Sequence, residues 1–173
     1  IIGMMIVIER LIKLSRISAL MKKQLKDMDH ASDDNPLGRM LLAYYENKHL
    51  KDLDVLSKKL DEVIFKDLAE LRKGLSTIKV LAAIAPLMGL LGTVTGMIGT
   101  FQAITQSGGG DSRLMADGIS QALVTTVLGL VVAIPLLFLH SLLASRSKAL
   151  IQLLEQQSAG LIALHLSGAP RRD

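Results

Sequence analysis

Hydrophobic residues are concentrated in two long stretches of the chain that carry no charged side chain. The first covers residues 80–110 and the second covers residues 118–145. Each stretch exceeds the roughly 20 apolar residues that an α-helix needs to cross a hydrocarbon core about 30 Å thick. We therefore predict two transmembrane helices, at residues 80–104 and 114–143.

The chain opens with a shorter apolar run. The sequence IIGMMIVIER contains about eight apolar residues before its first charges, which is too few to span a bilayer. We interpret residues 1–12 as the inner end of a third transmembrane helix that begins before residue 1. A signal peptide is the alternative, but no basic segment precedes the apolar residues and no small-residue cleavage site follows them.

A stripe of leucine and isoleucine precedes the first complete span. These residues recur every three or four positions, at Leu50, Leu53, Leu56, Leu60, Ile64, Leu68, Leu71, Leu75 and Ile78. The spacing predicts an amphipathic helix whose apolar face packs against a neighbouring helix. Because Gly74 is a weak helix breaker and the next proline is Pro86, we expect one continuous helix over residues 47–104, roughly 87 Å long at 1.5 Å per residue.

Two further segments complete the polar part of the chain. The acidic sequence DMDHASDDNP at residues 27–36 contains Asn-Pro and predicts a loop. After the second complete span, a helical stripe continues at Leu142, Leu150, Leu153, Leu154, Leu161 and Leu164. We predict that residues 144–173 form a tail helix, whose apolar face also packs against a neighbouring helix.

Lysine and arginine indicate how the chain is oriented in the membrane. They crowd the polar ends of the apolar runs, at Arg10, Lys13, Arg16, Lys22, Lys23, Lys26, Arg72, Lys73, Lys79, Arg146 and Lys148. The connection at residues 105–113 holds a single basic residue, Arg113. By the positive-inside rule, residues 13–79 and 144–173 are cytoplasmic and residues 105–113 form an outer turn. The N-terminus is then outside and the C-terminus inside.

Glycines define one face of the span at residues 80–104. They occur at Gly89, Gly92, Gly96 and Gly99, with spacings of three and four residues that confine them to a sector about 80° wide. A glycine face lets a neighbouring backbone approach closely, which is how membrane helices associate. We favour helix packing over a ligand-binding role for these glycines.

Small and polar residues form a matching stripe on the span at residues 114–143. Those within about 100° of one another are Gly118, Gln121, Ala122, Thr125, Gly129 and Ala133, and Thr126 lies beside them. A membrane threonine often bonds a carbonyl of its own helix and needs no function. Several threonines and a glutamine on facing small-residue surfaces nevertheless suit an ion or water path. The candidate pore-lining residues are Thr93, Thr125, Thr126 and Gln121, and Gly118 and Gly129 are further packing candidates.

Several residue types are scarce, and this excludes other functions. Neither complete span holds Asp, Glu, Lys or Arg at mid-membrane depth, so a proton path requires a carboxylate from a partner. The chain has no Cys, and its four His lack ligand spacing, so we expect no metal and no cofactor. With three Phe, two Tyr and no Trp, it lacks the stacking surface of a nucleic-acid binder. The loops contain no catalytic constellation, so we do not expect an enzyme.

The two spans together resemble a known family. APLMGLLGTVTGMIGTF, followed by MADGISQALVTTVLGLVVAIPLLFLHSLLASR, is similar to the MotA/TolQ/ExbB proton channel family and to its ExbB and TolQ branch, over roughly residues 80–148. The resemblance implies an all-α integral membrane protein of the bacterial inner membrane, with three transmembrane helices, a periplasmic N-terminus and a cytoplasmic C-terminus. It also implies a pentamer in membrane lipid around single-span partners of the ExbD or TolR kind, which energises a TonB-like or TolA-like protein.

The family pattern assigns roles to three positions of this chain. The resemblance implies that Thr93 and Thr126 line the pore, whereas Gln121 stands where the family pattern has a Glu. Glutamine does not titrate, so a mechanism that protonates this side chain does not transfer, although Gln121 can still bond water or a partner carboxylate. The family's partner subunit carries a transmembrane Asp, which fits the missing charge noted above.

The sequence leaves three functions open. The first is a proton-channel and motor subunit, with the protonatable group supplied by the partner helix. The second is a non-conducting membrane scaffold of the same kind of complex, which the glutamine favours. The third is a subunit resembling a flagellar stator, although such subunits usually have four spans and a larger cytoplasmic insertion.

Overall fold

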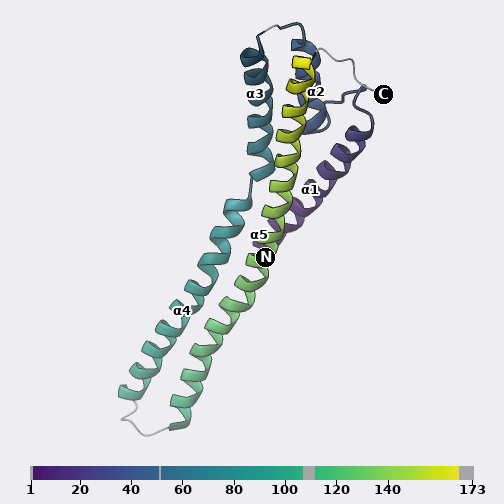
Figure 1. Cartoon of the computed structure of the whole chain (residues 1–173). Helices are drawn as coiled ribbons and strands as arrows, with labels where there is room; N and C mark the ends of the chain where they lie inside the picture. The colour runs from purple at the N-terminus through teal and green to yellow at the C-terminus, as the bar shows by residue number, and fades with distance from the viewer. Residues whose placement is uncertain (1, 51, 107–111, 168–173) are drawn as a thin grey trace. The chain divides into compact units, whose positions relative to one another are not determined.

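The computed structural model describes residues 2–50, 52–106 and 112–167, and all of its regular structure is helical (Figure 1). The helices are α1 (Ile2–Lys26), α2 (Pro36–Asn47), α3 (Leu53–Arg72), α4 (Leu75–Gln106) and α5 (Ser112–Ser167). The predicted turn at residues 105–113 and the predicted tail helix at residues 144–173 each include residues outside this description. The assignment of residues 1–12 to a third span and the orientation in the membrane stay predictions.

The helices form two compact units. The apolar unit comprises Ile1–Val7 and Leu75–Ser141, and the charged unit comprises Ile8–Gly74 and Leu142–Asp173. Helices α1 and α5 each contribute to both units without a break in their helical structure.

The apolar unit contains the parts of α4 and α5 that are long and apolar enough to cross a membrane. Their most apolar windows have mean hydropathies of 1.9 and 2.6, and only 11% and 17% of these windows is buried within the chain. A core helix of a soluble protein would be mostly buried. The exposed residues include Leu123, Ile134 and Phe138, at 56%, 64% and 67% exposure. This surface is suited to lipid or to other membrane helices.

The charged unit buries the leucine stripes. On α3 the buried apolar residues are Leu56, Leu60, Ile64 and Leu71, and on α5 they include Leu143, Leu150, Leu154 and Leu161. Helix α5 packs against α3, where the buried Ser147 hydroxyl donates to the Leu71 carbonyl over 3.0 Å. Among the described residues of this unit, the predicted packing is observed for these leucines and isoleucines, whereas Leu142 and Leu164 of the predicted tail stripe are exposed.

The loop between α1 and α2 is held by one buried amide side chain. The Gln24 Nε2 group donates to the carbonyls of Asp27 and His30, and the Gln24 Oε1 atom accepts from the Ser32 amide. Asn35 caps α2, since its side chain accepts from the Gly38 amide over 2.9 Å. The predicted loop at residues 27–36 is confirmed, except that Pro36 is the first residue of α2.

The expectation of one continuous helix over residues 47–104 is wrong. Helix α3 begins only after the Asp52 cap and ends at Arg72, and α4 starts at Leu75. Between them Gly74 has φ of 79°, in the left-handed region where only glycine avoids a steric penalty. The single glycine in the stripe therefore ends one helix and allows the next to start.

Replacing Gly74 with alanine is expected to lower the free energy of unfolding by about 1 kcal/mol, because a Cβ atom strains a residue with positive φ. The matched control is Gly160→Ala, at an exposed helical position of α5 where an added Cβ meets no atom within 4 Å in the described part of the chain. Alanine there should stabilise the chain by up to about 1 kcal/mol. Unfolding of both variants in detergent measures whether each substitution raises or lowers the free energy of unfolding. Equal changes in the two variants would contradict the role of Gly74.

Candidate pore-lining hydroxyl cluster

Helices α4 and α5 approach each other closely at two glycines. A Cβ atom added to Gly89 would lie 2.8 Å from the Thr125 carbonyl oxygen and 3.0 Å from Thr126 Cα. One added to Gly129 would lie 2.7 Å from the Ala85 carbonyl oxygen. These neighbours are backbone atoms, which cannot rotate away as the end of a side chain can. Any larger residue at either position would push the two helices apart.

The other candidate packing glycines differ in their surroundings. Gly92 lies against the Thr125 side chain, Gly96 against Ala122, and Gly118 of α5 against the Thr100 side chain of α4. Gly99 meets no atom within 4 Å in the described part of the chain. Five of the six candidates thus lie in the contact between α4 and α5, and Gly99 lies outside it.

Three of the four candidate pore residues lie together at this contact. The hydroxyl groups of Thr93 and Thr126 are 2.8 Å apart, which is hydrogen-bonding distance across the two helices. The Thr125 hydroxyl donates to the carbonyls of Gly89 and Ala122, over 3.1 and 2.6 Å. All three threonines are half-buried. We call Thr93, Thr125 and Thr126 the hydroxyl cluster.

The three hydroxyl groups of the hydroxyl cluster surround the carbonyl of Gly89, which can accept only two hydrogen bonds. The Gly89 carbonyl oxygen lies within 3.1 to 3.3 Å of all three threonine hydroxyls, yet a carbonyl has only two lone pairs. Each hydroxyl also has an alternative acceptor, such as the Leu90 carbonyl for Thr93. The hydroxyl protons can therefore rearrange among several acceptors without a change in the backbone, as a hydrogen-bonded proton path requires.

Gln121 does not join this cluster. It lies one turn before Thr125 on α5, but its side chain is exposed. Its neighbour Ala122 is 2% exposed and occupies the contact with α4 instead. A pore-lining role for Gln121 therefore depends on other helices, and it stays a prediction.

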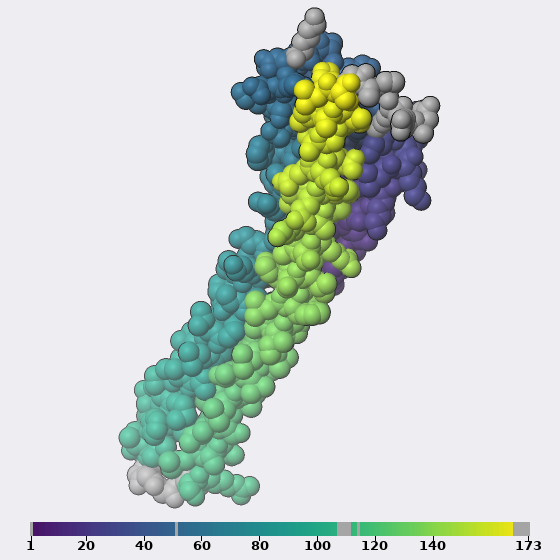
Figure 2. All heavy atoms as spheres, viewed as in Figure 1, coloured from purple at the N-terminus to yellow at the C-terminus, as the bar shows by residue number. Residues whose placement is uncertain are grey.

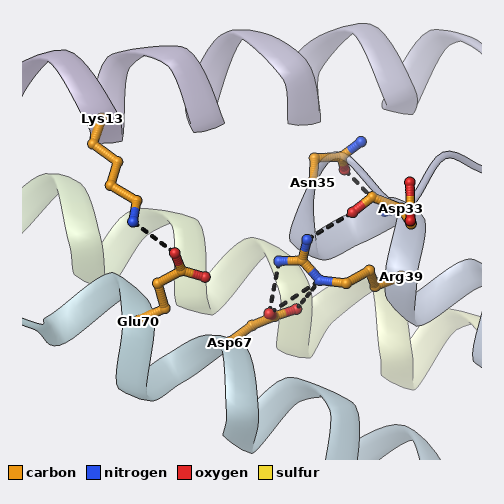
Figure 3. Close-up of polar contacts among 7 residues, drawn as sticks. Lys13, Asp33, Asn35, Arg39, Asp67 and Glu70 are labelled. Atoms are coloured by element: carbon orange, nitrogen blue, oxygen red, sulfur yellow. Dashed lines mark hydrogen bonds and ion pairs between the residues drawn. The ribbon is translucent and has the colours of Figure 1, made fainter.

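The charged unit contains ion pairs that the sequence patterns did not reveal (Figure 3). Asp67 of α3 is 5% exposed, and both its oxygens accept from the Arg39 guanidinium, the shortest contact being 2.7 Å. The same guanidinium donates to the Asp33 carbonyl over 2.7 Å. Lys13 of α1 contacts Glu70 of α3 over 2.6 Å. The partners are 28 and 57 residues apart, so no local spacing connects them.

The Lys13 pair gives the charged unit a pH-dependent contact. The hydrogen bond from Lys13, followed by its charge, holds the pKa of Glu70 below its ordinary value of 4.5. A lowered carboxyl pKa adds stability above the unfolded-state pKa, and this stability is lost as pH falls through the folded-state pKa.

Replacing Glu70 with glutamine should therefore destabilise the chain at neutral pH, by less than about 1 kcal/mol because the pair is exposed. The difference from the wild type should shrink to zero as pH falls below 4.5 and through the lowered pKa. Unfolding measured from pH 7 to pH 3 tests this, with Lys13→Met expected to behave alike. If Glu70→Gln lowered the free energy of unfolding equally at pH 7 and at pH 3, the ion pair would be excluded as the cause.

Among the residues that the structure describes, no group of His, Asp and Glu is arranged to hold a metal ion.

Comparison with known proteins gives a family match. Residues 32–156 match the model of the MotA/TolQ/ExbB proton channel family. An ExbB-like protein of Synechocystis is 38% identical over 63% of this chain and 44% of its own length. The biopolymer transport protein ExbB of Helicobacter pylori is 42% identical over 47% of this chain and 56% of its own length. A biopolymer transport protein of Vibrio cholerae is 32% identical over 75% of this chain and 59% of its own length. The chain thus spans about half the length of these relatives.

Proposed function

Because the chain belongs to the MotA/TolQ/ExbB proton channel family, in its ExbB-like branch, we propose that it is a proton-conducting subunit of an energy-transducing complex in the inner membrane. The observation that carries this proposal is the hydroxyl cluster. It places three rearrangeable hydroxyl groups between two spans that hold no titratable carboxylate at mid-membrane depth. Such a path can pass a proton along but cannot hold one, so the acid comes from another chain.

The proposed complex is a ring of identical chains around single-span partner helices. In this arrangement five copies surround a lumen, and the hydroxyl cluster and Gln121 face it. A partner of the ExbD or TolR kind supplies a transmembrane Asp, and proton movement energises a TonB-like or TolA-like protein. The exposed apolar residues of α4 and α5 contact lipid and neighbouring copies. The N-terminus is periplasmic and the C-terminus cytoplasmic.

The double variant Thr93→Val with Thr126→Val tests the hydroxyl cluster. Valine keeps the shape of threonine but removes the hydroxyl that spans the 2.8 Å contact. Loss of one or two hydrogen bonds, at about 1 kcal/mol each, should slow proton flux about tenfold. Flux is measured in vesicles that contain the chain with its single-span partner.

The matched control removes two hydroxyls outside the cluster. Thr95→Val with Ser120→Ala changes exposed residues of α4 and α5, and the Thr95 hydroxyl bonds only carbonyls of its own helix, those of Leu91 and Gly92. Proton flux should stay within about twofold of the wild type. Normal flux in the Thr93 and Thr126 double variant would exclude their lining role.

A non-conducting scaffold is the second candidate. Gln121 favours it, because an exposed glutamine occupies the position where the family pattern has a titratable Glu. A scaffold would use the glycine contacts for assembly and the charged unit to dock partners. Proton flux at background in vesicles containing the wild-type chain and its partner would select this function. The relatives named above carry ExbB-type names, so the flagellar-stator alternative has less support.

A further inference from the structure

The charged unit has a groove between α1 and α5 (Figure 2 shows both helices). Its volume is about 530 Å³. Lys22 and Arg146 contribute cationic groups from the two helices, and Ser15 and Ser18 contribute hydroxyls from α1. Leu14 and Leu150, at 2% and 8% exposure, are among the apolar residues of its wall. The groove thus combines two cations, two hydroxyls and an apolar surface.

The charge of this groove differs from that of three other grooves in the described part of the chain. No described carboxylate lines it, whereas Asp34 lines two of the three other grooves and Asp61 lines the third. Neither Lys22 nor Arg146 forms an ion pair with a described residue. Both cations are exposed and available to an anion. The groove is therefore complementary to a negatively charged group.

The position of the groove along the chain indicates the source of that anion. Arg146 follows the end of the predicted span at residue 143 by three residues, or about 4.5 Å along a helix. Ser15 follows the predicted inner end of the first span, residues 1–12, by the same number of residues. The depth of these two residues corresponds to the headgroup layer of the inner leaflet, and Lys22 lies further along α1 on the side away from the span. An apolar wall beside cations suits a molecule that has both acyl chains and an anionic headgroup.

We propose that this groove binds the headgroup of an anionic phospholipid of the cytoplasmic leaflet. The phosphate oxygens accept hydrogen bonds from Lys22, Arg146 and the two serines, in the manner of basic pockets between membrane helices. The location of the site rests on the membrane topology of the proposed function. The binding chemistry does not depend on proton conduction.

The full chain, reconstituted in nanodiscs of phosphatidylglycerol and phosphatidylcholine in equal amounts, tests the proposal. Native mass spectrometry after release from the nanodiscs counts the lipids that each chain retains. The wild type should retain phosphatidylglycerol in preference to phosphatidylcholine. The variant Lys22→Gln with Arg146→Gln should reduce this preference about tenfold.

Three further variants separate the site from general charge and folding effects. Lys26→Gln with Lys148→Gln removes the same charge from the same helices outside the groove and should keep the preference. Lys22→Arg with Arg146→Lys preserves both charges and should also keep it. Ala149→Phe, at an exposed residue of the groove wall, should reduce lipid retention although both cations remain.

Each outcome bears on the proposal. It is overturned if the Lys22 and Arg146 double glutamine variant keeps the preference, or if the Lys26 and Lys148 control loses it equally. Displacement of the lipid by millimolar inorganic phosphate would overturn it as well, since the site would then recognise phosphate alone. Proton flux without lipid preference would refute the lipid site and leave the proposed function standing. Lipid preference without proton flux would support the lipid site and refute the proposed function.

Discussion

Alanine at position 89 is expected to separate α4 from α5 and to reduce proton flux to background. The added Cβ would lie 2.8 Å from one backbone atom of α5 and 3.0 Å from another, so the helices must move. We expect a loss of about 2 to 3 kcal/mol in the free energy of unfolding. The movement also separates Thr93 from Thr126, whose contact is only 2.8 Å. Unfolding in detergent and flux in vesicles measure the two effects.

Gly99→Ala is the control for this prediction. It makes the same substitution on α4, at a glycine with no neighbour within 4 Å in the described part of the chain. The intrinsic preference of alanine for helix should make this variant neutral or up to about 1 kcal/mol more stable. If Gly89→Ala unfolds as the Gly99 variant does, the close helix contact is not what holds α4 against α5.

Asp67→Ala is expected to cost about 3 kcal/mol of unfolding free energy, because it leaves the Arg39 guanidinium partly buried without its main anion. The Asp67 side chain is 6% exposed and the Arg39 side chain 33%, so water offsets only part of the loss. The pair joins α2 to α3, and its removal should loosen that contact more than any other substitution of a single charge in the unit. Chemical unfolding of the full chain measures it.

A double substitution distinguishes the unpaired charge from the lost contact. Arg39→Met with Asp67→Leu replaces both partners by apolar groups and should cost less than Asp67→Ala alone, because no charge stays buried. Glu62→Gln breaks an exposed pair with Lys59, whose charged atoms are 3.8 Å apart, and should cost less than about 0.5 kcal/mol. If Asp67→Ala, the double variant and Glu62→Gln all lost the same free energy of unfolding, burial of the charge would not explain the effect of Asp67→Ala.

The apolar helices could be predicted from the sequence because long charge-free stretches have few explanations. A stretch such as residues 80–110 exceeds a membrane width, and its length settles the type of structure. The break at Gly74 could not be predicted in this way. The stripe of leucines continues across it, and a single glycine is tolerated inside many helices. Its positive φ is visible only in the folded chain.

The candidate site was predicted in part. Helical spacing correctly grouped Gly89 and Gly129 with the threonines, because 100° per residue fixes which residues share a face. It does not fix how far the neighbouring helix extends around that face. Gln121 is exposed and Gly99 has no neighbour in the described chain for this reason. The pairing of Arg39 with Asp67 depends on how α2 meets α3, which no local pattern encodes.

Helix α5 continues without a break, whereas α4 is separated from α3 by only two residues, and this difference affects how the backbone can twist. Helix α5 is one helix from Ser112 to Ser167, so a rotation about its axis would have to be carried by its hydrogen-bonded backbone, in which Pro135 supplies no N–H donor. Helix α4 is joined to α3 only through Lys73 and Gly74, whose backbone torsions can absorb such a rotation. The backbone can therefore twist more easily at Lys73 and Gly74 than at a position within α5.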